Sequence, residues 1–109
     1  MSKGRRTKAT DISPKVRQEV EERDHHVCIF CGSPNARGEM HYIRRSQGGL
    51  GIPKNILTGC RECHRQFDEG QAKALYREKA KQYLMSIYPD WNEKDLVYNK
   101  WGFLNGENE

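Results

Sequence analysis

Apolar residues recur at helical spacing near the start of the chain. Val16 and Val20 lie four residues apart among charged neighbours, which is typical of a short helix with a narrow apolar stripe. Ser13 followed by Pro14 marks the start of such a helix, because a hydroxyl caps the first turn and proline needs no amide partner there. The pattern therefore predicts a helix from Pro14 to about Asp24.

The C-terminal half contains a longer segment with the same periodicity. It predicts a helix from Gln71 to Tyr88 that ends at Pro89. Residues 92–95 resemble the start of one further helical turn. One face of the long helix is formed by Ala72, Tyr76, Ala80, Tyr83 and Ile87, and the aromatic residues expected to dock back on the domain are Trp91, Tyr98, Trp101 and Phe103.

The middle of the chain has shorter periodicities and more turn residues. Residues 27–32 alternate between apolar and polar and then reach a glycine, which predicts a strand that ends in a tight loop. A second strand is expected over residues 39–44, followed by a glycine-rich loop over residues 47–53. A helix is expected from Arg61 to about Glu69. Short strands mixed with helices indicate the α+β class.

The composition allows only a small hydrophobic core. The chain has 109 residues, 35% of them hydrophobic, and a mean hydropathy of -1.00. Domains of this kind commonly need a disulfide or a structural metal. Neither a long apolar run nor a secretory signal pattern is present, so we expect a cytoplasmic protein without a membrane partner. In a reducing compartment, paired cysteines are more often metal ligands than disulfides.

The net charge of +4 is concentrated at the N-terminus. Of 19 Lys and Arg residues, four precede Asp11, and the remaining ones equal the 15 Asp and Glu residues in number. We expect residues 1–10 to be a disordered basic tail. Such a tail either solubilises the protein or binds phosphate groups, and the sequence leaves both readings open.

Four cysteines form two pairs with the spacing of a zinc site. Each Cys-x-x-Cys turn brings two thiolates to one point, and two such turns complete a tetrahedral set. The ligands predicted for a structural zinc ion are Cys28, Cys31, Cys60 and Cys63. With four protein ligands, this zinc would have no open position for a substrate.

A second motif begins between the cysteine pairs. It reads His41-Tyr42-Ile43-Arg44-Arg45-Ser46-Gln47-Gly48-Gly49 and continues through Asn55 to Cys60-Arg61-Glu62-Cys63-His64. This string resembles the zinc-stapled HNH endonucleases of bacteriophages and prophages. The resemblance covers roughly Cys28 to Asp68 and implies a ββα-metal (His-Me finger) fold with flanking helices. It implies one nuclease domain over residues 11–109, with a core at 24–69 and a C-terminal helical extension at 70–109.

The resemblance assigns a role to three residues of the string. It implies that His41 is the general base, and an imidazole with an ordinary pKa of about 6.5 suits proton abstraction from water near neutral pH. Asn55 has no titratable proton, so its expected task is to hold the glycine-rich loop or the imidazole in place. His64 follows a zinc cysteine and is the expected ligand of a catalytic cation, Mg²⁺ or Mn²⁺.

The family usually has a second cation ligand directly before the general base, where this chain has Met40. A thioether binds hard cations poorly. Glu39 shares a strand face with His41, and Asp68 lies four residues beyond His64 on one helical face. Of these two carboxylates, Asp68 is the favoured substitute.

Arg44 and Arg45 adjoin the expected site, and guanidinium groups match the geometry of phosphate. We expect them to hold the DNA backbone. The resemblance thus implies metal-dependent hydrolysis of DNA, leaving a 5′ phosphate, in phage DNA processing or packaging with other phage proteins. The alternatives are a catalytically impaired zinc module that binds nucleic acid and a zinc scaffold for a protein partner. Substrate sequence and oligomeric state are not encoded in any pattern that we recognise.

Overall fold

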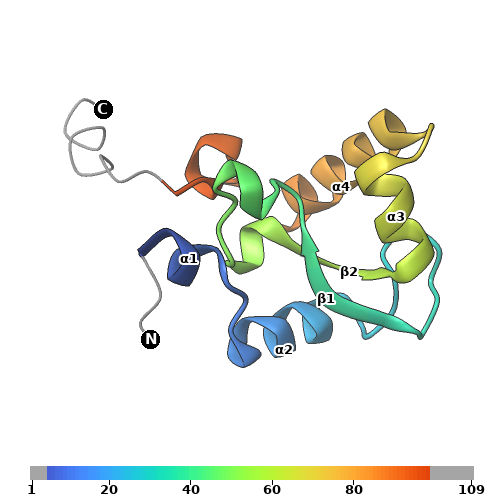
Figure 1. The fold of residues 1–109 in the computed structure, drawn as a ribbon. Coiled ribbons are helices and arrows are strands. Elements are labelled where there is room, and N and C mark those ends of the chain that lie inside the picture. Colours follow the sequence, from blue (N-terminus) through green and yellow to red (C-terminus); the bar gives the residue numbers. More distant parts are fainter. Residues whose placement is uncertain (1–4, 99–109) are drawn as a thin grey trace.

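The structure, a computed structural model, describes residues 5–98 and has the expected α+β class (Figure 1). No helix among these residues is long and apolar enough to cross a membrane. The helices and strands in chain order are α1 (Arg5–Thr10), α2 (Pro14–Arg23), β1 (Ala36–His41), β2 (Ile56–Cys60), α3 (Arg61–Glu69) and α4 (Lys73–Ile87), with 3-10 turns at Arg45–Gln47, Pro53–Asn55 and Glu93–Leu96.

The two strands form an antiparallel hairpin that is followed directly by α3. Met40 pairs with Leu57 and His41 with Ile56, and the register shifts between Arg37 and Met40. Because side chains alternate along a strand, Met40 is buried while His41 is only partly buried. Figure 1 shows α2 along one side of the hairpin and α3 beside α4 on the other.

The strand predicted over residues 27–32 is wrong. This segment is a turn in which the Gly32 amide donates to the Cys28 carbonyl over 2.8 Å, and Gly32 has a φ of 79°. One link to the hairpin runs from the Ile29 amide to the Thr58 carbonyl at 3.1 Å. The alternation in the sequence therefore reflects a turn with one buried cysteine.

The second predicted strand is displaced along the chain. It was expected over residues 39–44, but β1 comprises Ala36–His41. Ala36 and Arg37 pair with Cys60 and Gly59, so the strand extends to the end of β2. Pairing with β2 thus outweighs the turn-forming residues that precede Glu39.

The helix predictions agree better with the structure. Ser13 caps α2, since its hydroxyl accepts a hydrogen bond from the Val16 amide at 3.1 Å. Helix α3 begins at Arg61 and ends at Glu69 as expected, whereas α4 is shorter at each end than predicted. Asn92 caps the last 3-10 turn through the Lys94 amide at 2.9 Å.

The prediction of a disordered tail over residues 1–10 fails for residues 5–10, which form α1. The cause is docking: the Gly51 amide donates to the Ala9 carbonyl over 3.0 Å, and Thr10 is 3% exposed. A side chain at Gly51 would collide with the Asp11 carbonyl, so glycine permits this close approach. Residues 1–4 lie outside the described residues.

The main core lies between the hairpin, α3 and α4. Its buried members are Met40, Tyr42, Leu57, Phe67, Ala80, Leu84 and Leu96. Trp91 packs edge-on against Tyr42, with ring centroids 5.5 Å apart, and the Tyr98 amide donates to the Gly48 carbonyl at 2.6 Å. These two aromatic residues dock as expected, whereas Trp101 and Phe103 lie outside the described residues.

A buried ion pair connects α2 to the hairpin and α4. The Arg23 guanidinium donates to both carboxylate oxygens of Asp24, at 2.7 and 2.9 Å. The same carboxylate accepts from the Thr58 amide at 2.9 Å and from the Tyr83 hydroxyl at 2.5 Å. Burial tends to raise the pKa of Asp24, but the bonds from Arg23 and Tyr83 outweigh it and lower the pKa below 3.8. The resulting stabilisation is present above pH of about 4 and is lost as the pH falls through the lower, folded-state pKa.

We predict that Asp24→Asn lowers the free energy of unfolding by about 3–5 kcal/mol, because the Arg23 charge is left buried without its partner. Glu39→Gln is the control, since Glu39 forms an ion pair with Arg17 in which the two side chains are 43% and 44% exposed. We expect it to cost less than about 1 kcal/mol. Urea denaturation at pH 7 measures both, and equal losses would contradict the structural role of the buried pair.

Candidate metal centre and adjoining groove

The four cysteines converge on one point and can hold a metal ion. Their sulfur atoms all lie within 4.8 Å of one another. Cys28 and Cys31 come from the turn before β1, whereas Cys60 ends β2 and Cys63 lies in the first turn of α3. Metal–sulfur bonds of about 2.3 Å in a tetrahedron separate the sulfurs by about 3.8 Å. The cluster therefore has the dimensions of a site for a single ion.

Backbone amides are already directed at the sulfurs. The Phe30 amide donates to Cys28 Sγ and the Cys63 amide to Cys60 Sγ, each at 3.4 Å. Burial opposes ionisation of Cys28, but hydrogen bonds from Cys60, Cys31 and Phe30 lower the pKa of its thiol to about 7. Burial and the neighbouring sulfurs raise the pKa of Cys63. A bound cation would favour the ionised form of every one of these thiols, since all four sulfurs bind a metal as thiolates.

A groove of about 510 Å³ lies between the hairpin and α3. The structure brings five of the predicted site residues together along it: His41 from β1, Arg44 and Arg45 from the loop that follows, and His64 and Asp68 from α3; Glu39 and Glu69 complete its lining. Asn55 is fully buried and does not line the groove. One open surface thus carries imidazole, carboxylate and guanidinium groups.

The His41 ring is held by a backbone carbonyl. Its Nε2 atom lies 2.9 Å from the Thr10 carbonyl oxygen. Because a carbonyl only accepts, Nε2 must carry the proton, and Nδ1 of the neutral ring is left as an acceptor. Burial lowers the pKa of His41, and the charges of Arg45 and His64 act in the same direction against the opposing effect of the Thr10 carbonyl. The ring is therefore a neutral proton acceptor at pH 7.

Asn55 fixes the loop that follows His41. Its side-chain oxygen accepts from the Ile43 amide at 2.8 Å, and its nitrogen donates to the carbonyls of Ile43 and Leu50 at 3.2 and 2.8 Å. A side chain at Gly49 would collide with the Ile43 carbonyl, so the loop closes only around glycine. Asn55 therefore forms its hydrogen bonds with the backbone of the loop, which is one of the two expected roles, and not with the His41 imidazole.

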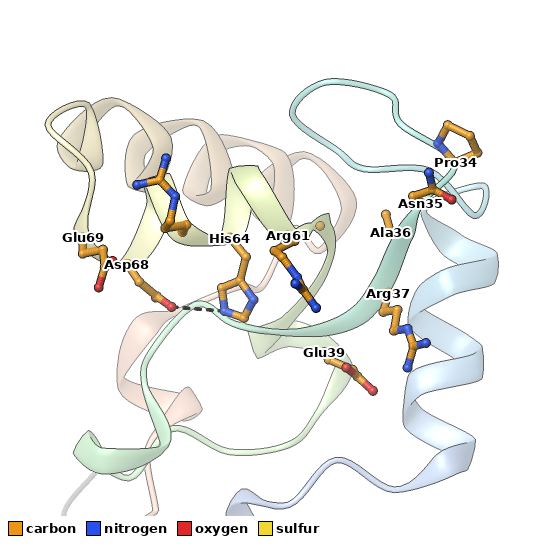
Figure 2. Close-up of a pocket in the computed structure, with 11 residues that line it drawn as sticks. Pro34, Asn35, Ala36, Arg37, Glu39, Arg61, His64, Asp68 and Glu69 are labelled. Carbon is orange, nitrogen blue, oxygen red and sulfur yellow. Dashed lines mark ion pairs between the residues drawn. The ribbon is translucent and has the colours of Figure 1, made fainter.

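His64 and Asp68 form a pair on α3. Their Nε2 and Oδ2 atoms are 3.2 Å apart, and the side chains are 42% and 38% exposed (Figure 2). An imidazole and a carboxylate can each give one ligand to a hard cation that keeps several waters. Among residues 5–98, the four cysteines are the one cluster in which three or more His, Cys, Asp or Glu side chains lie close enough to share an ion. His64 and Asp68 thus offer two neighbouring ligand side chains.

The two residues weighed beside Asp68 are placed differently. Met40 is 1% exposed and packs in the core, so its side chain does not face the groove. Glu39 lines the groove, but its carboxylate accepts from Arg17 at 2.8 Å. Asp68 is thus the carboxylate that lies within contact distance of His64.

Arg44 and Arg45 both make contacts within the protein. One guanidinium nitrogen of Arg44 donates to the Asp68 carbonyl at 2.6 Å, which ties the loop to the end of α3. Arg45 pairs with Asp11, and its side chain is 52% exposed.

Sequence reasoning missed the contribution of the segment before α2. Thr10 orients His41 through its carbonyl, and Asp11 holds Arg45. A backbone carbonyl has no residue-type signature, so no sequence pattern could have identified the Thr10 contact. For the contact between Asp11 and Arg45, the available signal was an acidic residue directly after a basic segment.

Comparison with known proteins adds one limited similarity. No family model and no solved structure matches the chain significantly. Anaredoxin from Nostoc sp. (strain PCC 7120) is 28% identical over 60 residues, which cover 54% of this chain and 79% of Anaredoxin. The similarity therefore extends over about half of the chain.

We predict that Cys60→Ser leaves the domain unfolded at 25 °C. A structural zinc site contributes about 10–16 kcal/mol in small peptides, which matches or exceeds the stability of a whole domain, about 5–15 kcal/mol. Circular dichroism melting and metal analysis measure the effect. His41→Ala is the control and should retain both the bound metal and the melting transition. Matching melting curves for wild type and Cys60→Ser would refute the metal centre.

We predict that His41 is neutral at pH 7 with its proton on Nε2, and that its titration midpoint lies below 6.5, because burial disfavours the imidazolium. Long-range ¹H–¹⁵N spectra across a pH series measure both properties, and the spectrum of His41→Ala identifies the signals. A proton on Nδ1, or a midpoint above 6.5, would show that Thr10 does not set the state of the ring.

Proposed function

We propose that the protein is a metal-dependent endonuclease of the HNH type that hydrolyses phosphodiester bonds in DNA. One observation carries the proposal. The His41 ring is held through Nε2, which leaves Nδ1 as a proton acceptor, and the same groove holds the His64–Asp68 pair. A general base, a candidate cation pair and arginines along one groove are the parts that this reaction needs.

The chemistry divides among the groove residues. His41 accepts a proton from water, and the hydroxide equivalent attacks phosphorus while the bond from phosphorus to the 3′ oxygen breaks and that oxygen takes a proton from solvent water. When bound by His64 and Asp68, Mg²⁺ or Mn²⁺ would neutralise the charge that develops on the phosphodiester. Asn55 keeps the loop, and with it Arg44 and Arg45, in position beside the groove. The products are a 5′ phosphate and a 3′ hydroxyl.

We propose zinc as the ion of the four cysteines. Thiolates suit zinc, and a site filled by four protein ligands stabilises the fold without reacting. The hairpin followed by α3 supports the ββα-metal arrangement, since β1 carries His41 and α3 carries His64. A setting in phage DNA processing follows from the resemblance of the motif alone.

A second candidate function is electron transfer by one iron ion in the cysteine cluster. The name of the Nostoc relative, which denotes a redox protein, and the single-ion dimensions of the cluster favour it. Four-sulfur tetrahedral sites hold zinc or iron. Iron gives a coloured protein that bleaches on reduction, whereas zinc gives a colourless one, so absorption spectra and metal analysis of the purified protein separate the two.

We predict that the wild-type protein nicks supercoiled plasmid when Mg²⁺, Mn²⁺ or Ni²⁺ is added, and that His41→Ala lowers the rate by about 10²–10⁴-fold, because the general base is lost. Gel electrophoresis of timed samples measures the rate, and end-labelling tests for the 5′ phosphate.

The matched control is His26→Asn, at an exposed turn position with a φ of 59° that asparagine tolerates. It should cut like the wild type. Equal cutting by wild type and His41→Ala would identify a contaminant or another base. DNA that is retarded in a gel but not cut would favour the impaired module that binds nucleic acid. If the protein neither retards nor cuts DNA, the zinc scaffold for a protein partner is favoured.

A further inference from the structure

A second hollow continues the groove beyond His64. It lies between β1 and the first turns of α3 and shares Glu39, His64, Asp68 and Glu69 with the groove that contains His41. Its far end is lined by the segment 34–37 and by Arg61 (Figure 2). The two hollows therefore adjoin along α3, and we call them together the channel.

The side chains of two arginines at this far end have no partner among the described residues. Arg37 from β1 and Arg61 from the first turn of α3 are both exposed and line the hollow. Within residues 5–98, neither guanidinium group takes part in a hydrogen bond, ion pair or ring contact, whereas Arg65 pairs with Glu62 at 2.7 Å. In Figure 2 both lie on the side of His64 that faces away from Asp68, Arg61 on α3 and Arg37 on β1.

The acidic residues of the channel pair with other groups. Glu39 lies on the same side of His64 as Arg37 and Arg61 (Figure 2), but its carboxylate accepts from Arg17, and Asp68 pairs with His64. Glu69 lies beside Asp68, on the side away from Arg37 and Arg61 (Figure 2). The far end thus presents two unpaired positive charges with planar donor groups, a combination that suits a phosphate group.

We propose that Arg37 and Arg61 form a phosphate subsite that holds the DNA backbone next to the phosphodiester at His41. The inference rests on the proposed function and extends it, because it gives the path of the strand: along the channel, past His64, toward the start of β1. Contacts to phosphate position a strand without reading its bases. The subsite therefore adds affinity and register but no sequence preference.

The test compares Arg37→Ala/Arg61→Ala with Lys15→Ala/Lys79→Ala, which removes the same charge at exposed residues outside the channel. Fluorescence anisotropy with a labelled duplex, without added divalent cation, gives Kd between 50 and 200 mM salt. Each lost phosphate contact reduces the slope of log K against log salt by about 0.9. The rise in Kd over this salt range should therefore be about tenfold smaller for the arginine variant than for wild type, and nearly unchanged for the lysine variant.

A second measurement separates the subsite from the reaction. Bis(p-nitrophenyl) phosphate has a single phosphodiester and cannot reach the far end, so the arginine variant should hydrolyse it at the wild-type rate while its KM for plasmid DNA rises. Absence of hydrolysis by wild type would refute the nuclease, but the salt dependence would still decide the subsite. An unchanged salt slope, or equal slopes for the two double variants, would overturn the subsite.

Discussion

The four cysteines impose the constraint on which the rest of the structure depends. They bring the turn after α2 close to the junction of β2 and α3, two segments about thirty residues apart, and a metal ion held by all four would link them. The apolar core between the hairpin and α4 is small, so a link of this kind has a large effect on stability. Because Cys63 directly precedes His64, the link also sets where α3 presents its imidazole.

Two polar contacts transmit this constraint to the groove. The buried Arg23–Asp24 pair attaches α2 to β2 and α4, and α2 directly follows the segment that contains Thr10. That segment reaches back over the hairpin, where the Thr10 carbonyl meets the His41 ring. The orientation of one imidazole thus depends on an element outside the hairpin and α3. Such dependence is common where a site is supported by surrounding polar contacts.

The sequence allowed prediction of the parts that depend on residue type and spacing. The cysteine pairs indicated one metal cluster, Ser13 and Pro14 marked the start of α2, and the i,i+4 spacing of His64 and Asp68 placed them on one face. Parts that depend on tertiary contacts were not predictable. The alternation around Cys28 resembles that of a strand, but the segment forms a turn at the cysteine cluster. Pairing with Cys60 extends β1 to Ala36. Backbone partners, such as the Thr10 carbonyl, are invisible in any sequence pattern.

Met40 shows how the fold limits the ligands of a cation in the groove. Strand alternation directs the residue before His41 into the core, where Met40 packs with Leu57 and Phe67. A carboxylate at position 40 of this hairpin would be buried among apolar side chains, at a cost of several kcal/mol unless a partner accompanied it. A thioether suits that position because it is apolar and adapts to its neighbours. In the proposed nuclease, the ligands for a hard cation would come from α3, where the Asp68 carboxylate lies beside His64 and remains accessible to water. The same alternation that stabilises the core would then leave the proposed metal-binding role to the helix.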